Sequence, residues 1–528
     1  MADAPPRPVI VVTGANSGVG LGTCQRLLVQ LSAPLPSDTE PRFALRDGPA
    51  ALPSPFAAPH GCTLVLACRN PVKAHRARRE LMALLEALGE LPDEAQPTEA
   101  PRSRRLPKGS IDEDADPALA AQAVEASIRR RRRRGAAAAA ATAEGQAQDA
   151  LASGATSSAL PPPKALDTYD ETRDGDGASL SFAAREARAR GVYRRRFVAG
   201  TRIEFVPLDL GSMASVLSCA KDITERHGYV THLILNAGTA AWTGINWALA
   251  TWMIITRTRA LLPALRATPY ATPSRVIWTG SIEAFGRFYK PDDWQCLDPK
   301  RSPHPYESSK YQCELAALGL EDALRGPVRL PTAPGTPTGD ASPRTAQGIE
   351  PTSFTAHPGV VASSIFAEYL NVFMALCMKF AFYLARWTLS PHHPIEAYKG
   401  AVAASHVALA PLASLDPTRR YGARADFWAR EYVDAGRMDG WAQRRDRQAS
   451  EQEGEHVRAQ ARDLIARLEG VAGRVWEEAR DGSLPPFREL GPAGDSFSSA
   501  LLLPSSKRAE PASPADADRD WEKVESEV

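Results

Sequence analysis

Tyr306 and Lys310 lie four residues apart in the stretch His-Pro-Tyr-Glu-Ser-Ser-Lys at 304–310. On a helix this spacing places both side chains on one face, where the Lys310 ammonium can stabilise the ionised form of the Tyr306 phenol. A phenol tuned in this way can protonate a carbonyl oxygen while a cofactor delivers hydride. The pair alone is weak evidence, because the chain has 12 tyrosines and lysine is a common residue. Its meaning depends on the segments that surround it.

A glycine-rich segment at 13–20, Thr-Gly-Ala-Asn-Ser-Gly-Val-Gly, joins a short apolar run to an amphipathic helix. Glycines at such a turn let the backbone approach a pyrophosphate, which binds at the helix N-terminus. The spacing G-x-x-x-G-x-G differs from the commoner G-x-G-x-x-G fingerprint. We expect a nucleotide here, and a glycine turn without a ligand is the alternative. The predicted cofactor-binding residues of this segment are Gly14, Asn16, Ser17, Gly18, Val19 and Gly20.

Two polar residues follow later apolar runs. Arg69 comes directly after the run 63–68, where an acidic residue would bind the ribose hydroxyls of NAD. A cation in that place suits a 2′-phosphate, so the expected cofactor is NADPH, and a plain surface arginine is the alternative. Asp209 ends the run 203–209, where its carboxylate can meet the adenine amino group.

Apolar runs alternate with helical patterns along the chain, which predicts an α/β fold with a doubly wound parallel sheet of the Rossmann type. The runs expected to form buried strands are 8–13, 63–68, 203–209, 232–236, 275–280 and 353–357. The expected helices are at about 71–88, 213–227, 250–267 and 306–324. The sequence therefore predicts one domain over 1–410.

Low-complexity or proline-rich insertions interrupt this domain at 32–60, 92–198 and 326–351. The longest contains the arginine run 129–134 and too little apolar surface to offset its ordering entropy. Nucleic-acid binding through that run is disfavoured, because the run is isolated from any folded basic face. After the domain we expect a helical appendage over 411–488 and a disordered tail over 489–528.

Composition argues against several classes of protein. The formal net charge of +1 gives no general reason to expect a nucleic-acid or acidic partner. The seven cysteines lack metal-ligand spacing, so we expect neither a disulfide framework nor a metal site, and a reducing compartment is favoured. The N-terminus lacks a positively charged region followed by an apolar one, so no secretory signal is expected.

With these segments in order, the chain resembles the short-chain dehydrogenase/reductases. The block at 236–238 is similar to the N-A-G block that supports the cofactor in that family, and Ser281 follows the fifth strand, where the family keeps a carbonyl-binding serine. Tyr306 and Lys310 match the family's Y-x-x-x-K. The segment 358–363 resembles the part that covers the nicotinamide. The cofactor contacts that the resemblance implies are Asn236, Ala237, Gly238, Tyr306, Lys310, Pro358, Gly359, Val361 and Ser363.

The blocks at 242–247, 292–297 and 306–311 are similar to the fungal 3-ketosteroid reductases of ergosterol synthesis. That resemblance implies NADPH-dependent reduction of a sterol 3-keto group to the 3β-hydroxyl during C4-demethylation. In the implied mechanism Ser281 binds the keto oxygen, Tyr306 donates the proton and Lys310 holds the nicotinamide ribose. Reduction of another lipophilic carbonyl remains an alternative. The tryptophans in the first block and at position 252 suit a sterol site or ordinary packing.

One departure from the family concerns the helix before Ser281. The family places a proton-relay asparagine there, but residues 252–263 contain none. Either an Asn-Val-x-Gly block is missing from the sequence or the relay residue has been lost. A catalytically weakened scaffold for sterol-pathway enzymes is therefore the alternative to an active reductase. The resemblance implies oxidosqualene cyclase and the C4-demethylation enzymes as its partners.

Residues 365–389 are the most apolar stretch of the chain. A helix of this length could span a bilayer, but Glu368, Lys379 and Arg386 share one stripe along it. This pattern predicts an amphipathic helix in the membrane interface, at the endoplasmic reticulum or lipid-droplet surface. Packing against the protein's own core or a dimer partner is the alternative. The opposite, apolar face comprises Phe366, Leu370, Phe373, Cys377, Phe380, Leu384 and Trp387.

Overall fold

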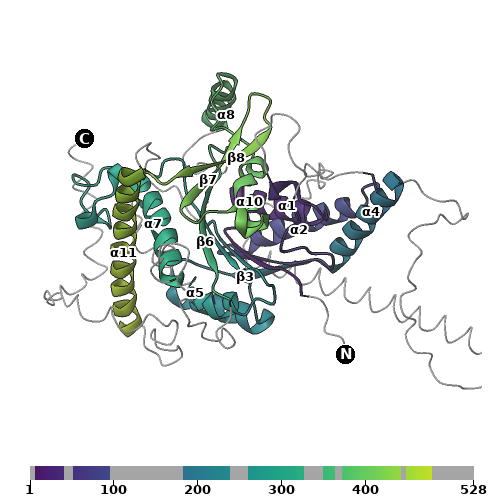
Figure 1. Cartoon of the computed structure of the whole chain (residues 1–528), viewed down its shortest axis with the longest axis horizontal. Helices are drawn as coiled ribbons and strands as arrows, with labels where there is room; N and C mark the ends of the chain where they lie inside the picture. The colour runs from purple at the N-terminus through teal and green to yellow at the C-terminus, as the bar shows by residue number, and fades with distance from the viewer. Residues whose placement is uncertain are drawn as a thin grey trace, which may run out of the picture. The chain divides into compact units, whose positions relative to one another are not determined.

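The computed structural model describes residues 6–40, 52–94, 182–237, 258, 260–325, 349–362, 372–441 and 447–478. Its centre is an eight-stranded sheet with the order β3-β2-β1-β4-β5-β6-β7-β8 (Figure 1). The strands are β1 Val9–Thr13, β2 Thr63–Cys68, β3 Arg202–Pro207, β4 His232–Leu235, β5 Arg275–Thr279, β6 Thr352–His357, β7 Arg419–Ala425 and β8 Glu431–Arg437. All neighbours pair in parallel except β7 and β8. The predicted α/β fold of Rossmann type is confirmed.

The described helices cover both faces of the sheet. They are α1 Gly18–Leu31, α2 Pro71–Gly89, α4 Phe182–Gly200, α5 Met213–His227, α7 Pro305–Arg325, α8 Val372–Trp387, α9 Ala397–Gly400, α10 Val402–Leu409 and α11 Arg447–Glu478. Short 3-10 turns lie at η1 Ser37–Thr39, η2 Gly286–Phe288, η3 Pro291–Asp293 and η5 Leu412–Ser414. Alternate strand residues such as Ile10 and Val12 share a core with α1, α2 and α10. Val11 and Val65, which point the other way, are equally buried.

The sheet has two more strands, β7 and β8, than the sequence predicts. The prediction that 353–357 is the last strand is wrong, because β7 pairs with β6 and β8 pairs with β7. These strands carry Arg419, Arg420 and Arg424 and are only partly buried, so they lack the apolar run of a central strand. The helix expected in 411–488 is present as α11. The tail over 489–528 lies outside the described residues.

The last part of the predicted insertion 92–198 is a packed helix. In α4, Ala187, Gly191 and Phe197 are buried, and the helix contacts α2. The expectation that the whole insertion lacks a buried face is therefore wrong for this part. The many arginines of α4 conceal the spacing of its apolar residues in the sequence. One of these arginines, Arg194, is itself buried and donates to the carbonyl oxygens of Leu91 and Pro92.

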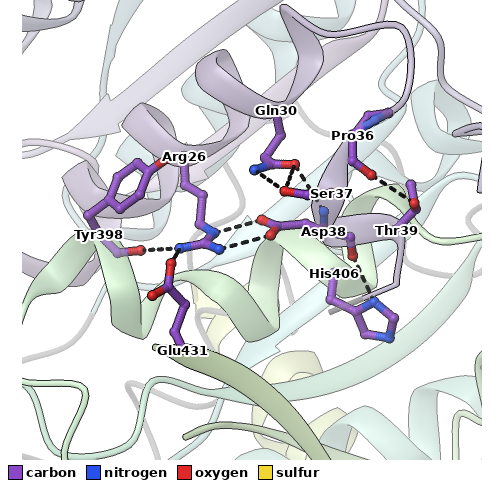
Figure 2. Close-up of polar contacts among 9 residues, drawn as sticks. All are labelled: Arg26, Gln30, Pro36, Ser37, Asp38, Thr39, Tyr398, His406 and Glu431. Carbon is purple, nitrogen blue, oxygen red and sulfur yellow. Dashed lines mark hydrogen bonds and ion pairs between the residues drawn. The ribbon is translucent and has the colours of Figure 1, made fainter. Parts of the chain in front are cut away.

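The predicted loop 32–60 also contains a buried part, at η1. Arg26 of α1 donates to both carboxylate oxygens of Asp38, at 2.6 and 2.8 Å, and to Glu431 of β8 at 2.8 Å (Figure 2). The same guanidinium reaches the Tyr398 carbonyl oxygen at 3.2 Å. Burial alone would lower the pKa of Arg26, but Asp38 and Glu431 raise it above its ordinary value. This network ties α1, η1 and the edge of the sheet together.

Helix α11 lies along α7, the helix that carries Tyr306 and Lys310 (Figure 1). The two helices approach closely at Gly319, where a Cβ atom would lie 2.6 Å from Ile465 Cγ1 and 3.0 Å from the Ala461 carbonyl oxygen. An ion pair between Arg458 and Asp322 joins the same two helices. The C-terminal helix thus holds α7 in place.

Helix α8 exposes its apolar face. The exposed residues include Phe373, Leu376, Cys377, Phe380, Leu384 and Trp387. Packing of this face against the described core, one of the sequence alternatives, is therefore excluded. Among the described residues no helix is both long and apolar enough to cross a membrane. Glu368, Phe366 and Leu370 lie outside the described residues.

Candidate active site

The predicted site residues follow the carboxyl ends of the parallel strands. Strand order reverses at β1, which lies between β2 and β4, and this is where α/β sheets of this type bind ligands. The glycine segment follows β1, Arg69 follows β2, Asp209 follows β3, and Ser281 lies two residues after the end of β5. One edge of the sheet therefore gathers segments that are far apart in the sequence.

The turn between β1 and α1 is held tightly against the segment after β4. Gly14 has a φ of 64° and its N–H donates to the Ala67 carbonyl oxygen at 2.9 Å. A Cβ atom on Gly14 would lie 2.9 Å from Ala237 Cα, and one on Gly20 would lie 2.3 Å from the Gly14 carbonyl oxygen. Neither position can accept a side chain without moving the backbone.

Thr13 connects the two segments. Its Oγ1 accepts hydrogen bonds from the backbone N–H groups of Asn236, at 2.8 Å, and Ala237, at 2.7 Å. The Asn236 side chain donates in return to the Thr13 carbonyl oxygen at 3.2 Å. Asn236 is thus tied to the strand that leads into the glycine turn, and Thr13 is a structural partner that was not predicted from the sequence. Gly238 lies outside the described residues.

Ser281, Tyr306 and Lys310 come together as the sequence predicts. The Tyr306 hydroxyl donates to Ser281 Oγ at 3.4 Å, and Lys310 Nζ lies 5.9 Å from the centre of the Tyr306 ring. All three residues are partly exposed, so a ligand can reach them. Pro305, the first residue of α7, suits a helix N-terminus because its missing N–H would have no intrahelical partner. The phenol and the serine hydroxyl can therefore bind one carbonyl oxygen between them.

Aromatic rings follow Ser281. Phe285 and Phe288 pack edge to face with their centroids 6.2 Å apart, and the Phe288 ring lies 4.0 Å from that of His304. Burial raises the pKa of the nearby Glu283 carboxyl, and Glu307 raises it further. The Arg287 guanidinium lies over both phenylalanine rings, 4.8 Å from the centroid of Phe285 and 4.7 Å from that of Phe288, so this segment combines aromatic and charged groups.

The remaining predicted contacts have varied environments. Arg69 is exposed, and the next residue, Asn70, caps α2 by accepting from the Lys73 N–H. Asp209 Oδ1 accepts a hydrogen bond from the Gly211 N–H at 2.9 Å, which stabilises the turn after β3. Asn16, Ser17, Gly18 and Val19 form the turn into α1, where the Ser17 side chain makes no capping hydrogen bond.

The segment after β6 is anchored to the chain around residue 392. The Val360 N–H donates to the His392 carbonyl oxygen at 2.7 Å, and Val361 forms a parallel bridge with Ile395. Pro358 and Gly359 precede this anchor, at the same strand edge as the other site segments. Ser363 lies outside the described residues.

A buried charge pair lies behind the reactive residues. Glu314, on α7, is fully buried and accepts a hydrogen bond from Arg420 Nη1 of β7 at 3.3 Å. Burial raises the pKa of Glu314 to about 7, although Arg420 lowers it. Neither residue was predicted from the sequence to belong to the site. The spacing of Tyr306, Lys310 and Glu314, each four residues after the last, is the signal that could have found the acid.

A dinucleotide fits this edge of the sheet. The backbone turns tightly at Gly14, and the Ser17 side chain does not cap the N-terminus of α1. The first N–H groups of α1 can therefore bind a pyrophosphate. Tyr306 and Lys310, on α7, lie beside Ser281, which follows β5 at the same edge of the sheet. A nicotinamide bound there would meet a carbonyl substrate. The residues that would hold the cofactor are those of the glycine turn, Asn236 and Lys310.

Comparison with known proteins confirms the narrower resemblance, to the fungal 3-keto-steroid reductases. No family model matches the chain. The 3-keto-steroid reductase of Aspergillus fumigatus is 27% identical over 340 residues, which are 52% of this chain and 74% of that protein. Its counterpart in Gibberella zeae is 25% identical, over 53% and 72% of the two chains. The match to the Eremothecium gossypii 3-keto-steroid reductase, also 25% identical, covers 39% and 61%. Among known reductases, the chain is similar to these fungal enzymes in particular.

Solved structures are more distant. The NADP complex of RhlG from Pseudomonas aeruginosa has a TM-score of 0.37 and 13% identity, over 78% of this chain and 92% of that one. A 3-oxoacyl-[acyl-carrier protein] reductase from Brucella melitensis has a TM-score of 0.34 and 11% identity, over 77% and 91%. The fold assignment rests on the strand order of the sheet rather than on these likenesses.

Proposed function

We propose that the chain is an NADPH-dependent 3-keto-steroid reductase, which reduces a sterol intermediate of ergosterol synthesis at its 3-keto group during C4-demethylation. The observation that carries the proposal is the hydrogen bond from the Tyr306 hydroxyl to Ser281 Oγ, with Lys310 one turn further along α7. The similarity to fungal 3-keto-steroid reductases supports the substrate class.

In this proposal the substrate's keto oxygen binds between Ser281 and Tyr306. Bound NADPH supplies the hydride that forms the new C–H bond at C3. Tyr306 gives its hydroxyl proton to the keto oxygen, and Ser281 donates a hydrogen bond to the same oxygen as negative charge develops on it. Lys310, one helical turn after Tyr306, would hold the nicotinamide ribose. One hydride and one proton are consumed, and the product is the 3β-hydroxyl.

The preference for NADPH is part of the proposal. Arg69 is exposed at the end of β2, where its guanidinium can bind a 2′-phosphate in two hydrogen bonds. An acidic residue in this place would repel that phosphate.

The test is NADPH oxidation in the presence of a 3-keto steroid, with the parent and Tyr306→Phe. Loss of the proton donor should lower kcat by about 10²–10⁴-fold, as for other general acids. Tyr311→Phe is a matched control, because it removes a phenol from the same helix whose hydroxyl bonds Gln460 instead. Equal turnover by the parent and Tyr306→Phe would contradict the proposal.

A second candidate function is a scaffold for sterol-pathway enzymes, such as oxidosqualene cyclase. The observation that favours it is the absence of asparagine from residues 252–263, most of which lie outside the described residues. A parent protein that binds NADPH but reduces no 3-keto steroid would support the scaffold. Sequencing the transcript across 245–262 tests whether an Asn-Val-x-Gly block has been omitted.

We also propose that α8 lies in the interface of the endoplasmic reticulum membrane, on its cytosolic face, or of a lipid droplet. The support is its exposed apolar stripe, in which Phe373 is 70% and Phe380 61% exposed. A water-insoluble sterol would then reach the site from the lipid phase. The test is flotation with liposomes: Phe380→Asp should weaken binding, whereas Lys379→Gln should have little effect. Equal flotation of parent and Phe380→Asp would contradict this proposal.

A further inference from the structure

We propose that Glu314 is a positioning residue of the reductase site, which holds Lys310 and the Gly280–Ser281 turn in register when its carboxyl group is ionised. The inference rests on the proposed reductase function. It assigns Glu314 a role that acts through its neighbours on α7 and β7.

Glu314 continues the row of reactive side chains on α7. Tyr306, Lys310 and Glu314 are spaced by four residues each, so their positions lie along one face of the helix. Tyr306 and Lys310 are partly exposed, whereas Glu314 is fully buried. The row therefore runs from the substrate side into the interior.

The Glu314 carboxyl group faces the turn that carries Ser281. A Cβ atom on Gly280 would lie 3.2 Å from Glu314 Oε1, so only a residue without a side chain leaves the carboxyl group its full space. Arg420 Nη1 bonds the same oxygen at 3.3 Å and also reaches the Ala284 carbonyl oxygen at 3.4 Å. One arginine thus links α7 to the segment that follows Ser281.

The second oxygen, Glu314 Oε2, is buried and has no hydrogen-bond partner among the described residues. A buried carboxylate oxygen without a partner costs free energy, and a purely structural pair would be expected to satisfy both oxygens. A cost of this kind is tolerated most often where the charge serves the chemistry of a site.

The groups that face Glu314 set its charge. Burial and Asp439, in the turn after β8, favour the neutral acid, whereas Arg420 on β7 and Lys310 on α7 favour the carboxylate. With its pKa raised to about 7, the group changes its charge in the physiological range. When ionised, Glu314 attracts both the guanidinium and the ammonium. When neutral, it loses its hold on both.

The experiment compares the parent with Glu314→Gln, a neutral isostere, at about pH 6 and about pH 8. NADPH affinity is measured by fluorescence titration, and kcat/KM by reduction of a 3-keto steroid. The two proteins should behave alike at the lower pH, where Glu314 is mostly neutral. At the higher pH the variant should be weaker by about fivefold or more, the low end of couplings between linked groups.

A parent-to-variant ratio that is the same at both pH values, in NADPH affinity and in kcat/KM alike, would overturn the proposal. A parent-to-variant ratio that grows from the lower to the higher pH, in either measurement, supports it, and a ratio that falls counts against it. A parent without turnover would contradict the reductase function alone, because the NADPH affinities still decide the role of Glu314.

Two further variants separate positioning from folding. Glu321→Gln is the matched control, because Glu321 is a buried carboxylate on the same helix that accepts from the Ser353 N–H at 2.7 Å. It should change the ratios equally at both pH values. Arg420→Gln removes the cation that favours ionised Glu314, so the pH dependence should move to higher pH. An unmoved profile in Arg420→Gln would also count against the proposal.

Discussion

Two arginine–carboxylate pairs with a buried carboxylate join distant parts of this fold, and they differ in how completely the carboxylate is hydrogen-bonded. Asp38 receives two hydrogen bonds from Arg26, and the remaining guanidinium nitrogen reaches Glu431 and a carbonyl oxygen. Glu314 receives one longer bond from Arg420 and leaves one oxygen without a partner. The first pair lies away from the candidate active site and the second lies directly behind it. The proposed positioning role of Glu314 therefore rests on its place beside the reactive residues as well as on its incomplete pairing.

Breaking the satisfied pair should have the largest effect on stability. Asp38→Ala leaves Arg26 buried with fewer partners, so unfolding should become easier by about 3–5 kcal/mol. Denaturant unfolding of the parent and the variant measures this loss. Asp426→Ala, which removes a surface partner of Arg430, is the control and should cost less than about 1 kcal/mol. A small loss in Asp38→Ala would remove the distinction between the two pairs.

Neutralising Glu314 should make the protein more stable at high pH, whereas removing the Asp38 carboxylate should make it less stable. The folded-state pKa of Glu314, about 7, lies above its ordinary value of 4.5, so the parent loses stability as pH rises between these values. Glu314→Gln lacks this penalty. Its stability relative to the parent should therefore be higher at about pH 8 than at about pH 4.5, by up to about 3 kcal/mol. Unfolding curves at both pH values measure the difference, and a relative stability that does not change with pH would contradict the assignment.

Replacing each arginine by lysine should sharpen the comparison. Arg26→Lys loses a two-pronged contact with Asp38 and should cost about 2 kcal/mol, because a lysine cannot reproduce the planar fork. Arg420→Lys keeps the charge beside a single-bonded carboxylate and should cost less than about 1 kcal/mol. Thermal unfolding of both variants checks the order. If Arg420→Lys proved the more damaging, the Glu314 pair would be the structural one.

An exposed arginine supplies the smallest expected effect on stability. Arg69→Ala should change the free energy of unfolding by less than about 0.5 kcal/mol, as for surface substitutions in general. NADPH affinity should fall by about tenfold while NADH affinity stays the same, since a bonded phosphate is worth about 1.5–3 kcal/mol. Parallel titrations with the two nucleotides check this. Equal losses for both would argue against binding of a 2′-phosphate, and Arg79→Ala, on α2, serves as the control.

The central part of the fold could be predicted from sequence because its signals are local. Strands β1 and β2 are continuous apolar runs buried on both faces, and the glycine turn follows β1 directly. The charge pair behind the site could not be found in this way. Arg420 lies 106 residues after Glu314, on β7, a partly buried strand whose arginines conceal its apolar pattern. Tertiary packing brings Glu314 and Arg420 together. The spacing of apolar residues along the chain therefore gives no sign of this contact.

The contact between α7 and α11 also has a consequence in time. Gly319 packs against Ala461 and Ile465, which are synthesised about 140 residues later. At ~5–20 residues per second, a ribosome needs roughly ten to thirty seconds to travel from Tyr306 to the end of this contact. During that interval the proton-donating helix has been made but its support has not. Assembly of the reactive site is therefore one of the last events in the biosynthesis of this protein, and a chain truncated before residue 461 would carry every reactive side chain without the helix that holds them.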